Sequence, residues 1–181
     1  VDAAQLEELV NALLRTWSDK LRDGLAEVVS REDAIKFSDV YSQAFNAEYR
    51  AATDPDIAAE DVLHFEAMRA DRREISIAFS NRGASTPIAG IEGATELKVY
   101  LLGKRLILSD FMPILEDVGL RVIAANPYEV ELLNESGTIY IFAVQDQKEH
   151  QLTVDGRGEL LSETILASRS GDVVSDSLNA L

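Results

Sequence analysis

The chain has 181 residues, of which 46% are hydrophobic, so it is long enough to bury the core of one domain or of two small ones. Its net charge of −15 argues against binding to nucleic acid or to an anionic membrane face, because both need a basic surface. The absence of cysteine excludes disulfides, thiolate metal sites and thiol nucleophiles, and no apolar run approaches the roughly 18 residues of a membrane span.

Residues 6 to 70 are predicted to form three helices. Apolar residues at a spacing of three and four predict the first helix, and Ser30 is placed to cap the second. The turn Asp54-Pro55-Asp56 ends the second helix, and residues 57–70 form a short third one that holds His64, Phe65 and Met68. The expected buried stripe of the first helix is Leu6, Leu9, Val10, Leu13, Leu14, Trp17, Leu21, Leu25 and Val28.

The second helix carries four aromatic residues, Phe37, Tyr41, Phe45 and Tyr49, at intervals of four. Rings at this spacing share one face of a helix. They can stack on a ligand, or they can pack into a core or an interface. The helical spacing favours packing.

From residue 75 the pattern alternates, as half-buried strands require. Strands are predicted at 75–80, 96–102, 120–124, 128–132 and 138–144, with Pro127 separating the third from the fourth. The loop 81–94 and the turn 135–137 connect strands, and Gly156-Arg157-Gly158 is a break before a helix over 159–170. That helix is expected to direct Leu160, Leu161, Ile165 and Leu166 inward.

One helix is predicted to lead directly into a strand within residues 107–123. Ser109 or Asp110 is placed to cap it, and Pro113 fits only within or just past its first turn. Gly119 supplies the left-handed residue that ends a helix, and Leu120 opens the strand. With the strands at 96–102 and 138–144, this segment makes a βαββ unit of a kind that usually binds or regulates.

The element order predicts an α+β fold: N-terminal helices packed on or beside an antiparallel sheet, which has helices on one face. We expect a helical segment over 1–71 and a sheet module over 72–181. Whether the two form one compact domain or two is left open.

No motif for catalysis, cofactor binding or metal binding is found. Gly90-Ile91-Glu92-Gly93 neither follows a strand closely nor opens a helix, so it does not fit a dinucleotide turn. His64 and His150 are far apart and lack metal-ligand spacing. No G-x-S-x-G elbow is present.

One loop is a candidate effector site. Lys98, Lys104 and Arg105 are basic residues around the Gly103 turn, which leads to the N-terminus of the predicted helix, where anions are favoured. The candidate effector loop comprises Gly103, Lys104, Arg105, Ser109 and Asp110, and its ligand would be a carboxylate such as an amino acid. The alternative, a solvated turn that balances the acidic surface, is favoured.

Three stretches resemble a known family. They are Leu14-Arg15-Thr16-Trp17, the run from Leu97 to Ile123 followed by Asn126-Pro127-Tyr128-Glu129-Val130, and the end Ser175–Leu181. Together they resemble the non-catalytic N-terminal region of the long-chain bacterial NAD-specific glutamate dehydrogenases. The resemblance implies an ACT-like (ferredoxin-like) module inside a longer enzyme, which also agrees with a chain that begins at Val1 without a methionine.

The resemblance implies a regulatory or assembly segment. The parent enzyme would oxidise L-glutamate with NAD to 2-oxoglutarate and ammonium, and its catalytic residues and NAD site would lie beyond this chain. A cytoplasmic homo-oligomer is expected, with self-association as the plainer role and an amino acid as the candidate effector, and with no cofactor, metal, nucleic acid or membrane bound here. The alternatives are a stand-alone amino-acid-sensing module and, more weakly, a hydrolase that uses acidic residues.

Overall fold

A computed structural model describes residue 5 and residues 16–81 and 91–175 of the chain. It divides into two compact units. Unit 1 comprises Val1–Arg72 and Glu129–Ser136, and unit 2 comprises Arg73–Tyr128 and Gly137–Leu181. In the described residues, no helix is both long enough and apolar enough to cross a membrane.

In its described residues, unit 1 contains four helices: α2 (Trp17–Ala26), α3 (Arg31–Ala44), α4 (Ala47–Ala52) and α5 (Pro55–Asp71). Each begins where the sequence provides a start signal. The Thr16 hydroxyl accepts from the Asp19 N–H, and the Asp19 carboxylate accepts from the Thr16 N–H, so the pair forms a capping box. Ser30 caps α3 as predicted, and α5 opens with Pro55 at its first turn, two residues earlier than expected.

The aromatic residues of unit 1 pack into its core, as the helical spacing indicated, but they do not lie on one helix. The helix predicted across them stops at Ala44 and restarts at Ala47. Phe45 adopts an extended backbone and forms an antiparallel bridge with Val130, while the Asn46 side chain accepts from the Tyr49 N–H and caps α4. The continuous helix was therefore wrong, because a long-range backbone pairing competes with helical periodicity at Phe45.

The rings nevertheless form one cluster. Phe45 stacks on Tyr49 with ring centroids 4.2 Å apart, and Tyr41 lies 5.6 Å from Phe45. Trp17 meets Phe45 edge-on, and its indole N–H donates to the Thr53 carbonyl. The buried members of this cluster are Tyr41, Phe45, Tyr49 and Phe65, whereas Phe37 is half-buried.

Unit 2 is built on a four-stranded sheet: β1 (Ile75–Ser80), β2 (Thr95–Leu102), β3 (Leu120–Glu131) and β4 (Ser136–Asp146). The spatial order is β1-β2-β4-β3. β2 pairs antiparallel with both of its neighbours. In the pairing with β1, Ile75 of β1 lies opposite Leu101 of β2, and in the pairing with β4, Thr95 of β2 lies opposite Val144 of β4. The tip of the β3–β4 hairpin, Glu129–Ser136, belongs to unit 1.

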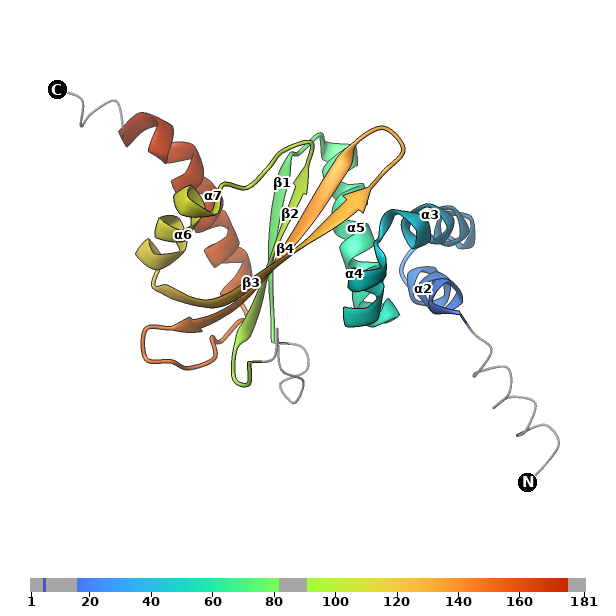
Figure 1. Cartoon of the computed structure of the whole chain (residues 1–181), viewed down its shortest axis with the longest axis horizontal. Coiled ribbons are helices and arrows are strands. Elements are labelled where there is room, and N and C mark those ends of the chain that lie inside the picture. Colours follow the sequence, from blue (N-terminus) through green and yellow to red (C-terminus); the bar gives the residue numbers. More distant parts are fainter. Residues whose placement is uncertain (1–4, 6–15, 82–90, 176–181) are drawn as a thin grey trace. The chain divides into compact units, whose positions relative to one another are not determined.

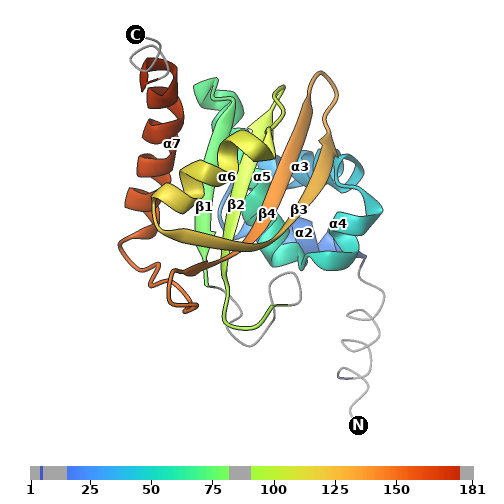
Figure 2. The same ribbon diagram turned by 60° about the vertical axis from the view of Figure 1, so that its left-hand side comes forward.

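Two helices of unit 2, α6 (Leu108–Asp117) and α7 (Gly158–Ser175), pack on one face of the sheet (Figure 2). Alternate β2 residues Leu97, Val99 and Leu101 project to this face. They are buried with Phe111, Ile114 and Leu115 of α6, Phe142 and Val144 of β4 and Ile165 of α7. The expected α+β architecture and the βαββ unit β2-α6-β3-β4 are confirmed.

Several boundaries differ from the prediction. Pro127 does not break the strand: β3 continues through it, because an edge strand tolerates a residue without an N–H. Five expected strands are therefore four, and the hairpin turn lies at Leu132–Glu135. Val28 and Leu160 were expected to be buried but are 62% and 64% exposed, since Val28 follows the end of α2 and Leu160 lies off the packed stripe of α7. The predicted stripe residues from Leu6 to Leu14 lie outside the described residues.

Candidate functional site

The loop between β2 and α6 begins with a glycine turn. Gly103 has φ +63°, a left-handed conformation that glycine adopts without strain. Lys104 then pairs with Glu74 at 3.5 Å, both side chains being exposed. Leu106 turns inward and joins the core of unit 2, whereas Ile107 remains exposed. The loop is thus anchored by one apolar residue between two exposed positions.

Helix α6 begins without the predicted side-chain cap. Ile107 occupies the N-cap position, and its carbonyl accepts from the N–H groups of Asp110 and Phe111, both at 3.1 Å. The prediction that Ser109 or Asp110 caps this helix was wrong, because the helix starts at Leu108 and puts both residues in its first turn. The Ser109 hydroxyl donates to the Asp110 carboxylate at 3.3 Å, and the carboxylate is favourably placed in the helix dipole.

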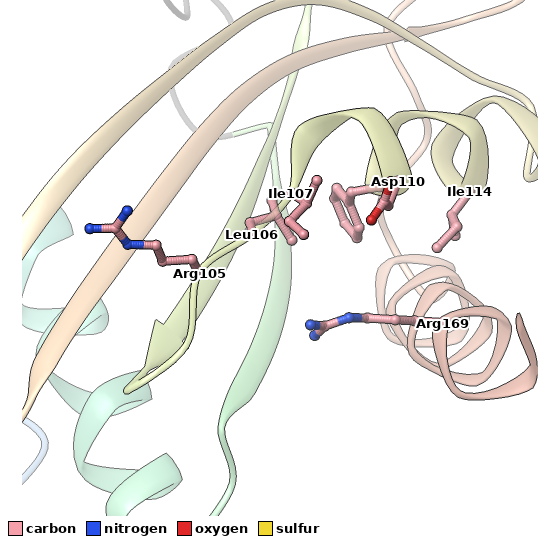
Figure 3. A pocket seen from close by; sticks show the side chains of 7 residues that line it. Arg105, Leu106, Ile107, Asp110, Ile114 and Arg169 are labelled. Carbon is pink, nitrogen blue, oxygen red and sulfur yellow. The ribbon is translucent and has the colours of Figure 1, made fainter. Parts of the chain in front are cut away.

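A cavity of about 240 Å³ opens beside this helix start. Its lining comes from the loop, from α6 and from α7, which pack against each other. Figure 3 shows Arg169 of α7 extending toward the loop, while the Arg105 guanidinium is directed away from it. The lining residues are Arg105, Leu106, Ile107, Asp110, Phe111, Ile114 and Arg169.

Two of the five residues of the candidate effector loop line this cavity, namely Arg105 and Asp110. Gly103, Lys104 and Ser109 do not. Lys98, the third member of the predicted basic cluster, lies within β2, where it pairs with Glu96 at 3.6 Å. The predicted basic residues therefore do not lie together: Arg105 lines the cavity, whereas Lys98 and Lys104 do not. The other arginine of the cavity is Arg169 of α7.

Arg169 was missed by reasoning from the sequence. The sequence pattern that could have indicated Arg169 is its position one helical turn after Ile165. Ile165 is buried against the sheet, and residues one turn apart share a face of a helix. The packing of α7 beside α6 could not be read from the sequence. Among the described residues, neither Arg169 nor Arg105 has an ion-pair partner.

This arrangement suits binding of a small polar molecule. A guanidinium binds a carboxylate or phosphate through two parallel hydrogen bonds, and the Asp110 carboxylate accepts from an ammonium group. Phe111 and Ile114 provide an apolar wall. The volume lies below the usual range for ligand pockets, about 300–1,000 Å³, so it fits a metabolite rather than a nucleotide. Within the described part of the chain, no three histidine or acidic side chains gather to hold a metal ion.

Comparisons with known proteins identify two segments of the chain. Residues 85–157 match the family model of the glutamate dehydrogenase ACT3 domain, and residues 25–68 match that of glutamate dehydrogenase helical motif 2. Similar proteins include the NAD-specific glutamate dehydrogenase of Pseudomonas aeruginosa, 28% identical over 182 residues that cover 100% of this chain and 11% of that protein.

Two further relatives carry the same name. The protein of Halomonas elongata is 26% identical over 186 residues, which cover 99% of this chain and 11% of the relative. That of Mycobacterium tuberculosis is 27% identical over 128 residues, which cover 70% of this chain and 7% of the relative. The chain thus spans about a tenth of the length of the curated relatives that it matches.

Proposed function

We propose that this chain, which carries helical motif 2 and the ACT3 domain of the glutamate dehydrogenase family, is a non-catalytic regulatory and assembly segment of an NAD-dependent glutamate dehydrogenase. The parent enzyme converts L-glutamate to 2-oxoglutarate and ammonium, with NAD as the cofactor held elsewhere in the enzyme. The shared name of the three relatives supports this assignment. The acidic, cysteine-free composition suits an enzyme of the cytoplasm.

The observation that carries the regulatory role is the cavity between α6 and α7. Its Arg169 guanidinium and its Asp110 carboxylate are charges of opposite sign beside an apolar wall. An α-amino acid has the complementary groups: its carboxylate pairs with Arg169, its ammonium with Asp110, and its side chain lies along Phe111 and Ile114. We therefore propose a free amino acid as the effector.

Calorimetric titration of the chain with each of the twenty protein L-amino acids tests this proposal. We expect heat of binding from at least one of them. Arg169→Gln should weaken that binding about tenfold or more, because a hydrogen bond to a charged group contributes about 1.5–3 kcal/mol. Arg157→Gln is the matched control, since Arg157 is exposed and does not line the cavity. No heat of binding from any of the twenty amino acids, or an affinity of the Arg169→Gln variant equal to that of the unmodified chain, would refute the effector role.

Self-association is the second role, and it is favoured by the edge of β3 that precedes Val130, the residue that bridges Phe45. β3 is an edge strand of 12 residues with Ile123 exposed, and such edges pair readily with a second copy. Pro127 lacks a backbone N–H, so the row of hydrogen-bond donors along β3 is interrupted at this residue. Pairing with a second copy is therefore limited to part of the strand. Sedimentation of the chain should show a dimer, and Ile123→Lys should shift it toward the monomer. A strictly monomeric chain would remove this role.

A further inference from the structure

The β3–β4 hairpin is shared between the two compact units. The strands from Leu120 to Tyr128 and from Gly137 to Asp146 belong to unit 2, whereas the tip, Glu129–Ser136, belongs to unit 1. The hairpin, which Figure 1 draws as one continuous ribbon, is therefore divided between the two units by its contacts. The contacts of the tip within unit 1 decide what it can do.

The apolar contact of the tip is Val130. This residue is buried and forms the antiparallel bridge with Phe45, at the break between α3 and α4. Phe45 is itself stacked on Tyr49, so Val130 meets the aromatic cluster at the point where the helix is interrupted. The bridge joins backbone groups, so release of the tip from unit 1 would leave the extended backbone of Phe45 without its bridge partner.

The polar contact of the tip is a chain of hydrogen bonds and ion pairs. The Arg69 Nε forms an ion pair with the Glu135 Oε1 at 3.1 Å, and the Arg69 Nη1 donates to the Glu66 Oε1 at 2.9 Å. The Tyr41 hydroxyl donates to the same Glu66 oxygen at 2.7 Å. Burial and this bond to Glu66 raise the pKa of Tyr41, so it remains a donor. Glu135 is thereby linked to both α5 and α3.

The polar contact of the tip is partly exposed to solvent. The Arg69 and Glu135 side chains are 40% and 35% exposed, so water and salt screen their attraction. Leu133, at the turn, is 91% exposed and adds no apolar anchor. Among the described residues, the tip contacts the rest of unit 1 through the bridge of the buried Val130 and through the partly exposed ion pair of Glu135.

We propose that residues 129–136 form a releasable latch, in which Val130 and Glu135 seat the hairpin tip on the helical unit and thereby order the break between α3 and α4. Release of the latch frees Phe45 from its bridge and loosens the aromatic cluster beside it. The latch and the strands that join the sheet of unit 2 belong to one ribbon, because β3 follows α6 through Gly119 and β4 pairs with β2. This device goes beyond the effector role and holds whether or not an amino acid binds.

Hydrogen–deuterium exchange of the whole chain tests the latch. Glu135→Gln removes the charge that pairs with Arg69, and Glu131→Gln is the matched control, because it removes the same charge from an exposed position of the tip that has no partner among the described residues. We expect Glu135→Gln to speed exchange about two- to fivefold, both in residues 129–136 and in residues 44–50. Salt at about 1 M should speed exchange in the unmodified chain in the same two segments.

A second variant probes the apolar contact. Val130→Ala should speed exchange in both segments more than Glu135→Gln does, because a buried side chain is truncated. β2 should exchange as in the unmodified chain in every variant. Two results would overturn the proposal: unchanged exchange at the tip in Glu135→Gln, or faster exchange at the tip while residues 44–50 remain protected.

Discussion

Asp146 stabilises the turn that follows β4. Its Oδ1 accepts from the backbone N–H groups of Lys148 and His150, both at 2.8 Å. The bond from His150, together with that from Lys148, lowers the pKa of the Asp146 carboxyl below its ordinary value of 3.8. The charged form is therefore favoured by the folded turn.

The pH dependence of this turn follows from the direction of the shift. Because the pKa is lower in the folded chain, the stabilisation is complete above about pH 4 and is lost as the pH falls through the folded-state pKa. Amide exchange of Lys148 and His150, measured by NMR, should be slow at neutral pH and should rise relative to neighbouring amides under acid conditions. Asp146→Ala should show the fast exchange at all pH values, and Asp155→Ala, in the next turn, should not.

At the scale of elements, Gly119 fixes the passage from α6 to β3. Its φ of +85° lies in the left-handed region, and an added Cβ would meet nothing within 4 Å. Any cost of a side chain at this position is therefore conformational rather than steric. Gly24 differs, since it lies inside α2 and an added Cβ would make ordinary contacts there, the nearest at 3.4 Å.

The two glycines should respond in opposite directions. Gly119→Ala should lower the free energy of unfolding by about 1 kcal/mol, because alanine is strained in the left-handed region. Gly24→Ala should leave it unchanged or raise it by up to about 1 kcal/mol, since alanine is the better helix former. Urea unfolding of each variant measures both changes. A loss at Gly24 equal to that at Gly119 would contradict this account.

The elements predicted correctly were those specified by local signals. Ser30 marks the start of a helix and Gly119 the end of one by their own side-chain and backbone chemistry, and the alternation in β2 marks a strand. The errors arose where a distant segment decides. Phe45 leaves its helix to bridge Val130, 85 positions along the chain, and Pro127 stays within β3 because that strand lies at an edge.

The same division holds for the candidate site. Arg105 and Asp110 were predicted because they lie near one turn and one helix start in the sequence. Arg169 comes from a helix that reaches the loop only through packing of α7 beside α6. Periodicity gives the inward face of such a helix but does not say which loop that face meets.

For the whole molecule, the cavity stands out by its charge. The chain has a net charge of −15, yet two of the seven cavity residues are arginines and one is an aspartate. Because the Arg105 guanidinium is directed away, the positive charge offered to a ligand is that of Arg169, which attracts an anionic group in an otherwise acidic molecule. This contrast supports a carboxylate ligand, and it implies that binding responds to ionic strength.

The kinetics of the proposed parent enzyme, a glutamate dehydrogenase that would contain this segment, test the central claim most directly. Initial rates of NADH formation are measured against increasing concentrations of the amino acid that binds the isolated chain, with each variant's rate without that amino acid as its reference. We predict that Arg169→Gln raises the concentration needed for a half-maximal response about tenfold or more, whereas Arg157→Gln leaves it unchanged. An identical response in both variants and in the unmodified enzyme, or NADH formation by the isolated chain, would contradict it.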